Sequence, residues 1–469
     1  MMPDAQHPLR YLFVDFNSYF ASVEQQEQPA LRHRPVAVVP LMSEGTCAIA
    51  ASYEAKAFGI RTGTSVREAK QRCPDLVLVP ARHEVYVEYH HRLLKEIDRH
   101  IPVHKVWSVD EMACKLDKTE RTREAASSLA RRIKAGIRER VGECLTCSIG
   151  IAPSSLLAKI ATDLQKPDGL VILTDADLPG PLLKLKLTDL PGIGERMARR
   201  LARAGIDTVS GLWALPPKQA RAIWGGVGGE RFWYALHGFD VPDLPTRKSV
   251  IGHSRVLDPG SRHPAAVHLV ARTLVLKAGY RLRKYGLAAG GFFLAGDKWE
   301  SGWASHIRFS PTQDSFAFLK WLDVLWPGLV ASAGRHPQFR HVQIGLFDLV
   351  EVGARQADLF LGGTGDETKR SKSECLWSLI DNLNTFYGRE TLTLASQLGQ
   401  ELHYAGAKIA FNRVPDAAEF TDTTFADDAK REAMHMLKSV KARRFAGWGR
   451  TFGMDNPGGS VEGDEPQLV

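Results

Sequence analysis

The sequence predicts a multidomain α+β protein. At 469 residues, the chain is too long for one ordinary hydrophobic core, and about three or four domains are expected. Short apolar runs alternate with helical stretches over residues 10–175, and the same alternation returns over residues 250–350. Between these regions, residues 179–238 are basic and helical in pattern, with no strand signal. The pattern therefore indicates two α+β units separated by a helical unit.

The first unit contains five runs that favour strands, because they are rich in β-branched and aromatic residues. These runs are YLFVDF, PVAVV, LVLVP, LTCSIGIA and GLVIL. Residues 65–72 and 122–141 are predicted helices. In the second α+β unit, the strand-like runs are GHSRVL, GGFFLAG, SHIRFS and HVQIGLFDLV, and residues 265–285 and 314–333 are predicted helices.

Two segments are predicted to be linkers. Residues 241–250 contain two prolines, which interrupt regular structure. Residues 362–373 (GGTGDETKRSKS) are polar and small, which is typical of a flexible connection. The end of the chain is rich in Gly, Pro and acids and is predicted to be disordered.

Charge and cysteine content favour an intracellular protein with a polyanionic partner. The net charge of +8 fits such a partner, although many soluble proteins share it. Among the six cysteines, only Cys144 and Cys147 have CxxC spacing, and no second pair completes a zinc site, so reduced thiols are expected. The N-terminus shows no apolar signal segment, and no run reaches transmembrane length. We expect a cytoplasmic protein.

Three carboxylates give the first chemical signal. Asp15 lies in the strand-like run YLFVDF, and the adjacent Asp110 and Glu111 lie in HKVWSVDEMAC. A lone buried charge is unfavourable, and two strand-borne acids brought together repel. A divalent cation removes that repulsion, and carboxylate oxygens together with substrate phosphates suit Mg²⁺. The pattern predicts a metal-dependent phosphoryl-transfer site.

Each of these acids has a simpler alternative. Asp15 could be a helix cap or a surface acid, since a helix is expected to begin near Ser18. Adjacent residues of a strand point to opposite faces, so Asp110 and Glu111 meet at one site only if the strand twists or ends there.

Two further clusters could bind phosphate. Tyr53 and Lys56 share one face if AASYEAKAFG is helical, and a phenol with an ammonium can grip phosphate oxygens. A solvated helix is the alternative. Lys159 and Lys166 are two helical turns apart, with Pro167 ending the helix, so Lys166 could neutralise a triphosphate at that end.

The segment LTDLPGIGERMARRLARAGIDTVSGL matches a helix-hairpin-helix. The glycine turn, with Gly192 and Gly194, would expose backbone N–H groups to a nucleic-acid phosphate, a contact that positions a duplex without reading its sequence. A purely structural helical hairpin is the alternative. Four arginines support the nucleic-acid interpretation: Arg196, Arg199, Arg200 and Arg203.

Together these stretches resemble the Y family of translesion DNA polymerases, in the group of DNA polymerases IV and V. DFNSYFASVE, SYEAKAFGI, SVDE, SIGIA…LLAKIAT…KPDG and LPGIG occur in the family's order. The resemblance is strong over residues 10–240 and weaker through the second α+β unit. It implies a right-hand polymerase, with palm and fingers over residues 1–175, a helix-hairpin-helix thumb over 176–240, a little finger over 241–350 and a C-terminal tail over 351–469.

The resemblance also implies roles for individual residues. Asp15, Asp110 and Glu111 would be catalytic and would bind two Mg²⁺ ions together with the Phe16 carbonyl. Phe20 would be the steric gate that excludes ribonucleotides. The remaining residues implied are Tyr53, Lys56 and Lys166 for the triphosphate, and Gly192, Gly194, Arg196 and Arg199 for DNA.

The sequence departs from the family pattern in three places. Lys56 stands where arginine is usual, which keeps the charge but loses the bidentate fork. Asn17 replaces a common aspartate, which we treat as a minor change. Ser154-Ser155 replaces a common Asn-Lys, which removes one possible DNA contact.

A short peptide after the second α+β unit predicts a protein partner. Gln356, Leu359 and Phe360 belong to QADLF, which resembles the peptide with which bacterial polymerases bind the sliding clamp. The two apolar side chains would fill a pocket, and the glutamine would hydrogen-bond at its edge. A strand end is the alternative. We derive no function for residues 374–469.

The prediction is therefore a template-directed DNA polymerase of the translesion type, which acts monomerically on primer-template DNA and dNTPs. The first competing hypothesis is a non-catalytic scaffold that binds DNA and the clamp in a mutagenesis complex. Such relatives lack the metal acids, all three of which are present here. The second is a nucleotide cyclase or another nucleotidyltransferase with a similar palm, which would need neither the hairpin motif nor the clamp peptide.

Overall fold

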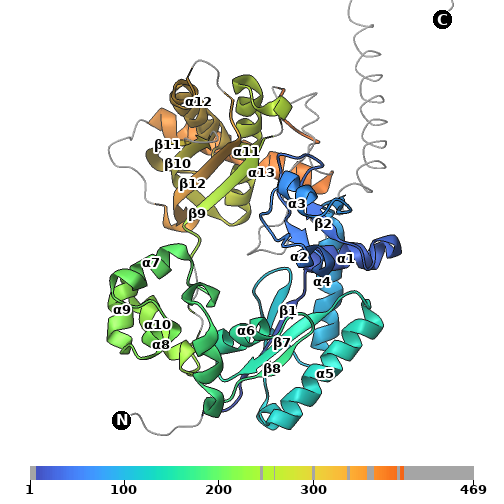
Figure 1. The fold of residues 1–469 in the computed structure, drawn as a ribbon. Coiled ribbons are helices and arrows are strands. Elements are labelled where there is room, and N and C mark those ends of the chain that lie inside the picture. Colours follow the sequence, from blue (N-terminus) through green and yellow to red (C-terminus); the bar gives the residue numbers. More distant parts are fainter. Residues whose placement is uncertain are drawn as a thin grey trace, which may run out of the picture.

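The computed structural model describes residues 7–242, 244, 247–257, 259–297, 302–334, 338–355, 364–387 and 391–395 (Figure 1). A five-stranded sheet, with strand order β5-β6-β1-β7-β8, forms the centre of the N-terminal unit. Its strands are β5 (Val103–Val106), β6 (Glu111–Lys115), β1 (Tyr11–Phe16), β7 (Cys147–Ala152) and β8 (Leu170–Ile172). The central strand β1 runs antiparallel to both of its neighbours.

Helices cover both faces of this sheet. The face that carries Leu12 and Val14 packs against α4 (His83–Asp98) and α5 (Arg123–Arg140). The face that carries Tyr11 and Phe13 packs against α6 (Ser155–Leu164) and the helical segment that follows. Alternate residues of β1 therefore anchor two separate cores, as expected for a strand buried on both faces.

A smaller sheet, ordered β3-β2-β4, belongs to the same N-terminal half. Its strands are β3 (Ala50–Ala51), β2 (Val36–Val39) and β4 (Val77–Pro80), and its helices are α1 (Tyr19–Glu27), α2 (Tyr53–Ala57) and α3 (Val66–Arg72). The predicted helices at 65–72 and 122–141 are confirmed, and each begins at a side-chain cap. The hydroxyls of Ser65 and Thr122 accept hydrogen bonds from the amides of Glu68 and Ala125.

The prediction of a helical segment over residues 179–238 is also confirmed. It consists of short 3-10 turns followed by α7 (Glu195–Arg203), α8 (Val209–Trp213), α9 (Pro217–Trp224) and α10 (Val227–Leu236). Buried Leu182, Leu201 and Trp233 join the core that includes Leu157 of α6. In Figure 1 this segment (green) and the small sheet (blue) lie on opposite sides of the five-stranded sheet.

The second α+β unit is an antiparallel sheet with two helices on one face. The strand order is β11-β10-β12-β9. The elements are β9 (Val250–Val256), α11 (Pro264–Lys284), β10 (Leu287–Asp297), β11 (Gly302–Thr312), α12 (Ser315–Ser332) and β12 (His341–Glu351). All four predicted strands and both predicted helices are present, and they share a core separate from those of the N-terminal half.

One prediction about this region is wrong. Residues 364–373 are not a flexible linker, because they belong to helix α13 (Thr364–Phe386). Two carboxylates of α13 attach it to the second α+β unit. Glu374 pairs with Arg355 at 2.8 Å, and Asp381 pairs with Arg283 at 2.5 Å. These ion pairs hold the part of α13 that follows the polar segment, and the segment itself continues the same helix.

The predicted clamp peptide at 356–360 and the chain beyond residue 395 lie outside the described residues. No helix among the described residues is long and apolar enough to cross a membrane.

Candidate active site

The site begins at the end of β1, where Asp15 is nearly buried. Its side chain is 7% exposed, and in the antiparallel pairing of β1 with β6 it lies directly opposite Glu111. Directly opposed residues share one face of a sheet, with Cβ atoms about 5 Å apart. Two strands therefore bring two carboxylates together, as the sequence predicted.

Asp110 reaches the same place because the run HKVWSVDEMAC is a hairpin and not one strand. Strands β5 and β6 pair antiparallel, Asp110 lies in the turn between them, and Glu111 is the first residue of β6. The backbone carbonyl of Asp110 accepts a hydrogen bond from the Phe16 amide at 2.9 Å. Because the strand begins only at Glu111, the two adjacent acids are not restricted to opposite faces of the sheet.

Two lysines, one in α6 and one just after it, form ion pairs with the acids. The Lys159 ammonium forms ion pairs with Asp15, with Glu111 at 2.9 Å and with Asp163 at 3.5 Å. The Lys166 ammonium lies 2.9 Å from Asp15 and 2.8 Å from Asp163. Asp15 therefore has a lysine at each of its carboxylate oxygens.

The close approach of α6 to β7 positions Lys159. A Cβ atom on Gly150 would lie 2.0 Å from the Ala158 carbonyl oxygen, so only glycine allows the helix backbone this near the strand. Ala158 precedes Lys159, and β7 is hydrogen-bonded to β1 beside Asp15. Gly150 in the SIGIA motif thus determines where the lysine lies.

The pKa of Asp110 is raised to about 6. Burial is the main cause, and the negative charges of Asp15 and Glu111 add to it. A hydrogen bond donated by the Ser108 hydroxyl opposes the shift. Burial alone would lower the pKa of Lys159, but Asp15, Asp163 and Glu111 raise it well above its ordinary value. The carboxylate cluster therefore favours a nearby positive charge.

The predicted phosphate-binding pair also lies next to this cluster. Lys56 stands over the Tyr53 ring at 4.3 Å from its centroid, so the two side chains share a face of α2 as expected. Burial lowers the pKa of Lys56, the Lys166 ammonium lowers it further, and Asp15 opposes both effects. Burial likewise raises the pKa of Tyr53, and the charges of Lys166 and Asp15 act on it. The small sheet therefore contributes a cation and a phenol beside the acids.

Phe20 lies in the first turn of α1, with its side chain 7% exposed. Its ring stacks on Tyr86 of α4, with centroids 4.4 Å apart and planes inclined by 16°. The ring therefore belongs to the same core as Leu12 and Val14 of β1, about one helical turn along the chain from Phe16.

Asn17, the departure treated as minor, has a structural role that the sequence did not show. Its amide donates to the Ser148 hydroxyl at 3.1 Å, and its carbonyl oxygen accepts from the Asp168 amide at 2.9 Å. It thereby links the end of β1 to β7 and to the loop after Lys166. The departure at Ser154 is similar, because its hydroxyl caps α6 and donates to the Ala235 carbonyl at 2.6 Å.

Two residues that contact the acid cluster or its lysines, Lys159 and Asp163, were not among the predicted site residues. Lys159 was placed on the face of Lys166 but assigned no role, and Asp163 was not considered. The available signal was spacing, since Asp163 lies four residues after Lys159 and three before Lys166, on one helical face.

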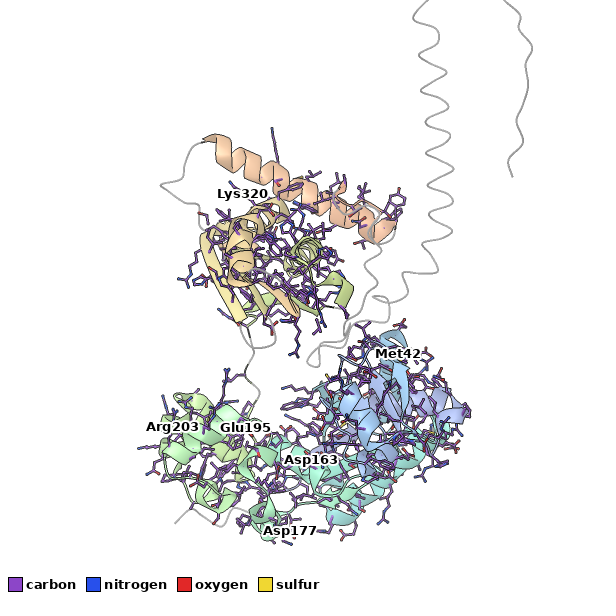
Figure 2. The ribbon with its side chains drawn as sticks, turned by 45° about the horizontal axis from the view of Figure 1, so that its top comes forward. Met42, Asp163, Asp177, Glu195, Arg203 and Lys320 are labelled. Atoms are coloured by element: carbon purple, nitrogen blue, oxygen red, sulfur yellow. The ribbon has the colours of Figure 1, made fainter. Side chains whose placement is uncertain are left out.

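The predicted DNA-binding residues form a separate group on the helical segment. Gly192 has φ +91°, which glycine adopts without strain, and no atom lies within 4 Å of a Cβ built on Gly194. Arg196 and Arg199 follow on α7, whose two ends are marked by Glu195 and Arg203 in Figure 2. The first amides of a helix lack intrahelical partners, so this turn offers donors to an anion.

The donor set of the acid cluster fits a hard divalent cation. Carboxylate oxygens are hard donors of the kind that such a cation prefers, and the negative charges of Asp15 and Glu111 contribute, after burial, to the raised pKa of Asp110. Within the described part of the chain, no three Asp, Glu, His or Cys side chains are arranged as metal ligands. Lys159 lies between Asp15 and Glu111.

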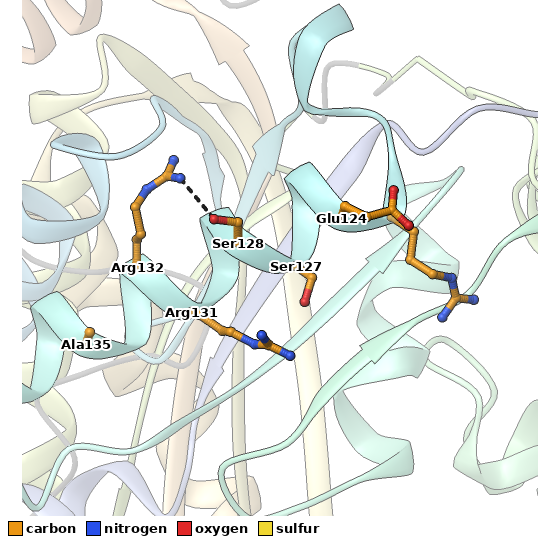
Figure 3. Close-up of a pocket in the computed structure, with 7 residues that line it drawn as sticks. Glu124, Ser127, Ser128, Arg131, Arg132 and Ala135 are labelled. Carbon is orange, nitrogen blue, oxygen red and sulfur yellow. Dashed lines mark hydrogen bonds between the residues drawn. The ribbon is translucent and has the colours of Figure 1, made fainter.

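A hollow along α5 lies elsewhere and includes none of these residues. Its volume is about 600 Å³, and Arg123, Ser127, Arg131 and Arg132 are among the residues that line it (Figure 3). Arg132 donates to the Ser128 hydroxyl at 3.4 Å. Helix α5 covers the sheet face opposite to that covered by α6, which carries Lys159.

Comparisons with known proteins identify relatives of this chain. The profile of the impB/mucB/samB family matches residues 14–163, which include all three acids and Lys159. DNA polymerase IV of Moorella thermoacetica is 34% identical over 415 residues, which cover 84% of this chain and 98% of that protein. DNA polymerase IV of Pelotomaculum thermopropionicum is 29% identical over 401 residues, which cover 82% and 95%.

Among solved structures, a chimeric Y-family DNA polymerase matches with a TM-score of 0.61 and 23% sequence identity. The match covers 73% of this chain and 99% of that one. At this level of identity, the likeness concerns the fold.

Proposed function

The chain belongs to the impB/mucB/samB family of Y-family DNA polymerases, and from this membership we propose how its site works. It is a DNA-directed DNA polymerase of the translesion type, which adds dNTPs to a primer 3′-hydroxyl. The observation that supports this chemistry best is the convergence of three carboxylates and two lysines at the end of β1.

The units of the fold correspond to the parts of a right-hand polymerase. We assign residues 1–175 to the palm and fingers, 176–240 to the thumb and 241–350 to the little finger. In this assignment the five-stranded sheet is the palm, and the small sheet with α1–α3 is the fingers. Residues 351–469 form the C-terminal tail, of which α13 is attached to the little finger through Glu374 and Asp381.

Asp15, Asp110, Glu111 and the Phe16 carbonyl would hold two Mg²⁺ ions. When bound, these ions would supply charge stabilisation at the attacking oxygen and at the triphosphate. Asp110 would bind metal as its carboxylate, and a bound cation would favour that ionised form. Ser108 and the Phe16 amide hold the side chain and backbone of Asp110, respectively.

Lys166, Lys56 and Tyr53 would bind the triphosphate. The two ammonium groups approach the acids from different units, Lys166 from the palm and Lys56 from the fingers, and the positive charge of Lys166 lowers the pKa of Lys56. A triphosphate between them would exchange this repulsion for two ion pairs. Phe20, with one face covered by Tyr86, would lie against the sugar and exclude a 2′-hydroxyl.

Primer-template DNA would contact the thumb through Gly192, Gly194, Arg196 and Arg199. Such contacts are made to phosphates and carry no sequence information. The peptide Gln356–Phe360, which lies outside the described residues, would bind the bacterial sliding clamp.

The non-catalytic alternative is not favoured, because the chain retains all three acids in one cluster. A primer-extension assay with Mg²⁺ and the variant Asp110→Asn tests this assignment directly. Extension should fall by at least about 100-fold, because charge stabilisation in the transition state is lost. Duplex affinity should stay close to that of the wild type, since the thumb is unchanged.

The exposed Asp75 provides a matched control for the loss of one negative charge. Asp75→Asn should extend primers normally. Extension by Asp110→Asn within about tenfold of the wild type would reject the metal role of Asp110.

A further inference from the structure

The ring of Phe20 does not stand alone in the core. One of its faces stacks on Tyr86, whose side chain is fully buried. The ring of Tyr19 is tilted against Phe20 at 5.7 Å, and the Tyr19 hydroxyl donates to the Tyr86 carbonyl at 2.6 Å. Both the ring and the backbone of Tyr86 are therefore tied to the first turn of α1.

The other end of Tyr86 is held by a buried carboxylate. The Tyr86 hydroxyl donates to Glu24 at 2.7 Å, and the Glu24 side chain has no exposed surface. Arg82 donates to both carboxylate oxygens of Glu24, with distances of 2.6–3.1 Å, and Gln28 donates to it at 3.0 Å. Burial and the Glu24 charge raise the pKa of Tyr86, so its hydroxyl stays protonated and remains a donor.

Four residues link helices α1 and α4 in a closed ring of contacts: Phe20, Glu24, Arg82 and Tyr86. We call this ring of contacts the frame. Phe20 and Glu24 are one turn apart on α1, and Arg82 and Tyr86 are one turn apart at the start of α4. The ring stack closes one end of the frame, and the charged hydrogen bonds close the other. The position of the Tyr86 ring is therefore set by Glu24 and Arg82 as well as by its own packing.

Steric exclusion depends on how firmly the excluding ring is held. The free energy of a clash cannot exceed that of the easiest side-chain movement that relieves it. A close-packed neighbour raises the free energy of that movement. Tyr86 occupies the space into which the Phe20 ring would otherwise retreat. We propose that Tyr86, held by Glu24 and Arg82, is a positioning residue that determines how strictly Phe20 excludes ribonucleotides. This inference rests on the proposed function, in which Phe20 lies against the sugar.

The test compares single-nucleotide insertion of dCTP and CTP opposite a template guanine. Tyr86→Leu removes the stacked ring, and Tyr86→Phe keeps the ring but removes its bond to Glu24. We expect Tyr86→Leu to lower the ratio of kcat/KM for dCTP over CTP by at least about fivefold, while kcat/KM for dCTP stays within about threefold of the wild type. Tyr86→Phe should lower the ratio by about twofold or more.

Tyr89 provides a matched control. It lies on the same helix, and its hydroxyl donates to Glu27 of α1 at 2.7 Å, so it also ties α4 to α1, but it is not stacked on Phe20. Tyr89→Phe should leave the ratio unchanged. If Tyr86 only held α4 against α1, substitutions of Tyr86 and Tyr89 would have similar effects. Each would then change kcat/KM for dCTP and for CTP by the same factor.

Phe20→Ala separates the failure of this inference from that of the proposed function. If Phe20→Ala leaves the ratio unchanged, Phe20 is not the gate and the assignment of the sugar site fails. If Phe20→Ala lowers the ratio but folded Tyr86→Leu stays within about twofold of the wild type, only the role of Tyr86 is overturned. Should Tyr86→Leu fail to fold, an unchanged ratio in Tyr86→Phe overturns it instead.

The double variant Phe20→Ala/Tyr86→Leu provides a second criterion. Because Tyr86 is proposed to act through Phe20, the ratio of kcat/KM for dCTP over CTP should be no lower in the double variant than in Phe20→Ala alone. An additional loss of the ratio in the double variant would mean that Tyr86 acts independently of the ring, against the proposal.

Discussion

Glu96 offers a stability prediction whose size can be worked out from the structure. It lies on α4 with 2% of its side chain exposed. Arg140, at the end of α5, donates to its two oxygens at 2.8 and 2.5 Å, and His100 and Arg99 lie 3.0 and 3.1 Å away. Gly136 makes room for this cluster, because a Cβ there would lie 2.2 Å from Glu96 Oε1.

The magnitude follows from the pKa of Glu96. The Arg140 hydrogen bonds are the largest cause that lowers this pKa from its ordinary 4.5 to about 2, burial opposes them, and His100 and Arg99 lower it further. At ~1.36 kcal/mol per pH unit, this difference limits the stabilisation to about 3 kcal/mol. Arg140 and Arg99 are 39% and 52% exposed, so solvent screens part of it. We expect Glu96→Gln to lower the free energy of unfolding by about 2 kcal/mol at pH 7.

The pH dependence identifies the cause. Because the pKa is lower in the folded state than in the unfolded state, ionised Glu96 stabilises the fold at neutral pH. This contribution is complete well above pH 4.5 and is lost as the pH falls from there towards 2. Urea unfolding followed by hydrogen exchange of the α4 and α5 amides should show a constant difference between wild type and Glu96→Gln near neutrality. The difference should vanish near pH 2.

Glu139→Gln is the control, since Glu139 pairs with the same arginine at 3.2 Å but is 75% exposed. It should change the free energy of unfolding by less than about 0.5 kcal/mol. Equal effects of the two substitutions, or a Glu96→Gln effect that persists at pH 2, would refute the reasoning.

Two further predictions concern partners. Arg196→Ala and Arg199→Ala should each weaken duplex binding to a similar extent for all sequences, and each should reduce the slope of log affinity against log salt by about one; unchanged slopes would count against the thumb assignment. Replacing Gln356, Leu359 and Phe360 with alanine should abolish stimulation of primer extension by a loaded sliding clamp and leave basal extension unchanged, because a tether only raises local concentration. A loss of basal extension or of melting temperature would instead favour a structural role for this peptide.

Elements with a strong local pattern were predictable from the sequence. The apolar run of β1, the capped helix α5 and the alternation of strands and helices in the second α+β unit all depend on neighbouring residues. The acid pair was predictable in part. Its residues were identified, but the run that carries them was taken as one strand. The turn at Asp110, which allows both acids to reach the site, has no Gly or Pro signal.

Helix α13 shows why composition alone misled. Its first turns are polar and follow two glycines, which is typical of a linker. Its stability depends on Glu374 and Asp381, whose partners Arg355 and Arg283 lie 19 and 98 residues away in the chain. The buried Trp377 adds a contact with Phe316 at the start of α12. None of these pairings is visible in a local window, because each depends on how the second α+β unit has already folded.

The same reasoning explains the incomplete prediction of the active site. Spacing placed Lys159 and Lys166 on one helical face, but it could not show that both would meet Asp15, 144 residues before Lys159. That meeting depends on Gly150, which lets α6 approach the sheet. As a result, the chain brings its own positive charges to the acids proposed to bind metal, and Lys166, the lysine proposed to bind the triphosphate, contacts Asp15 directly. The proposed metal site and the proposed triphosphate site are therefore coupled. A triphosphate that bound Lys166 would draw its ammonium away from Asp15 and would leave one carboxylate oxygen of Asp15 without that partner.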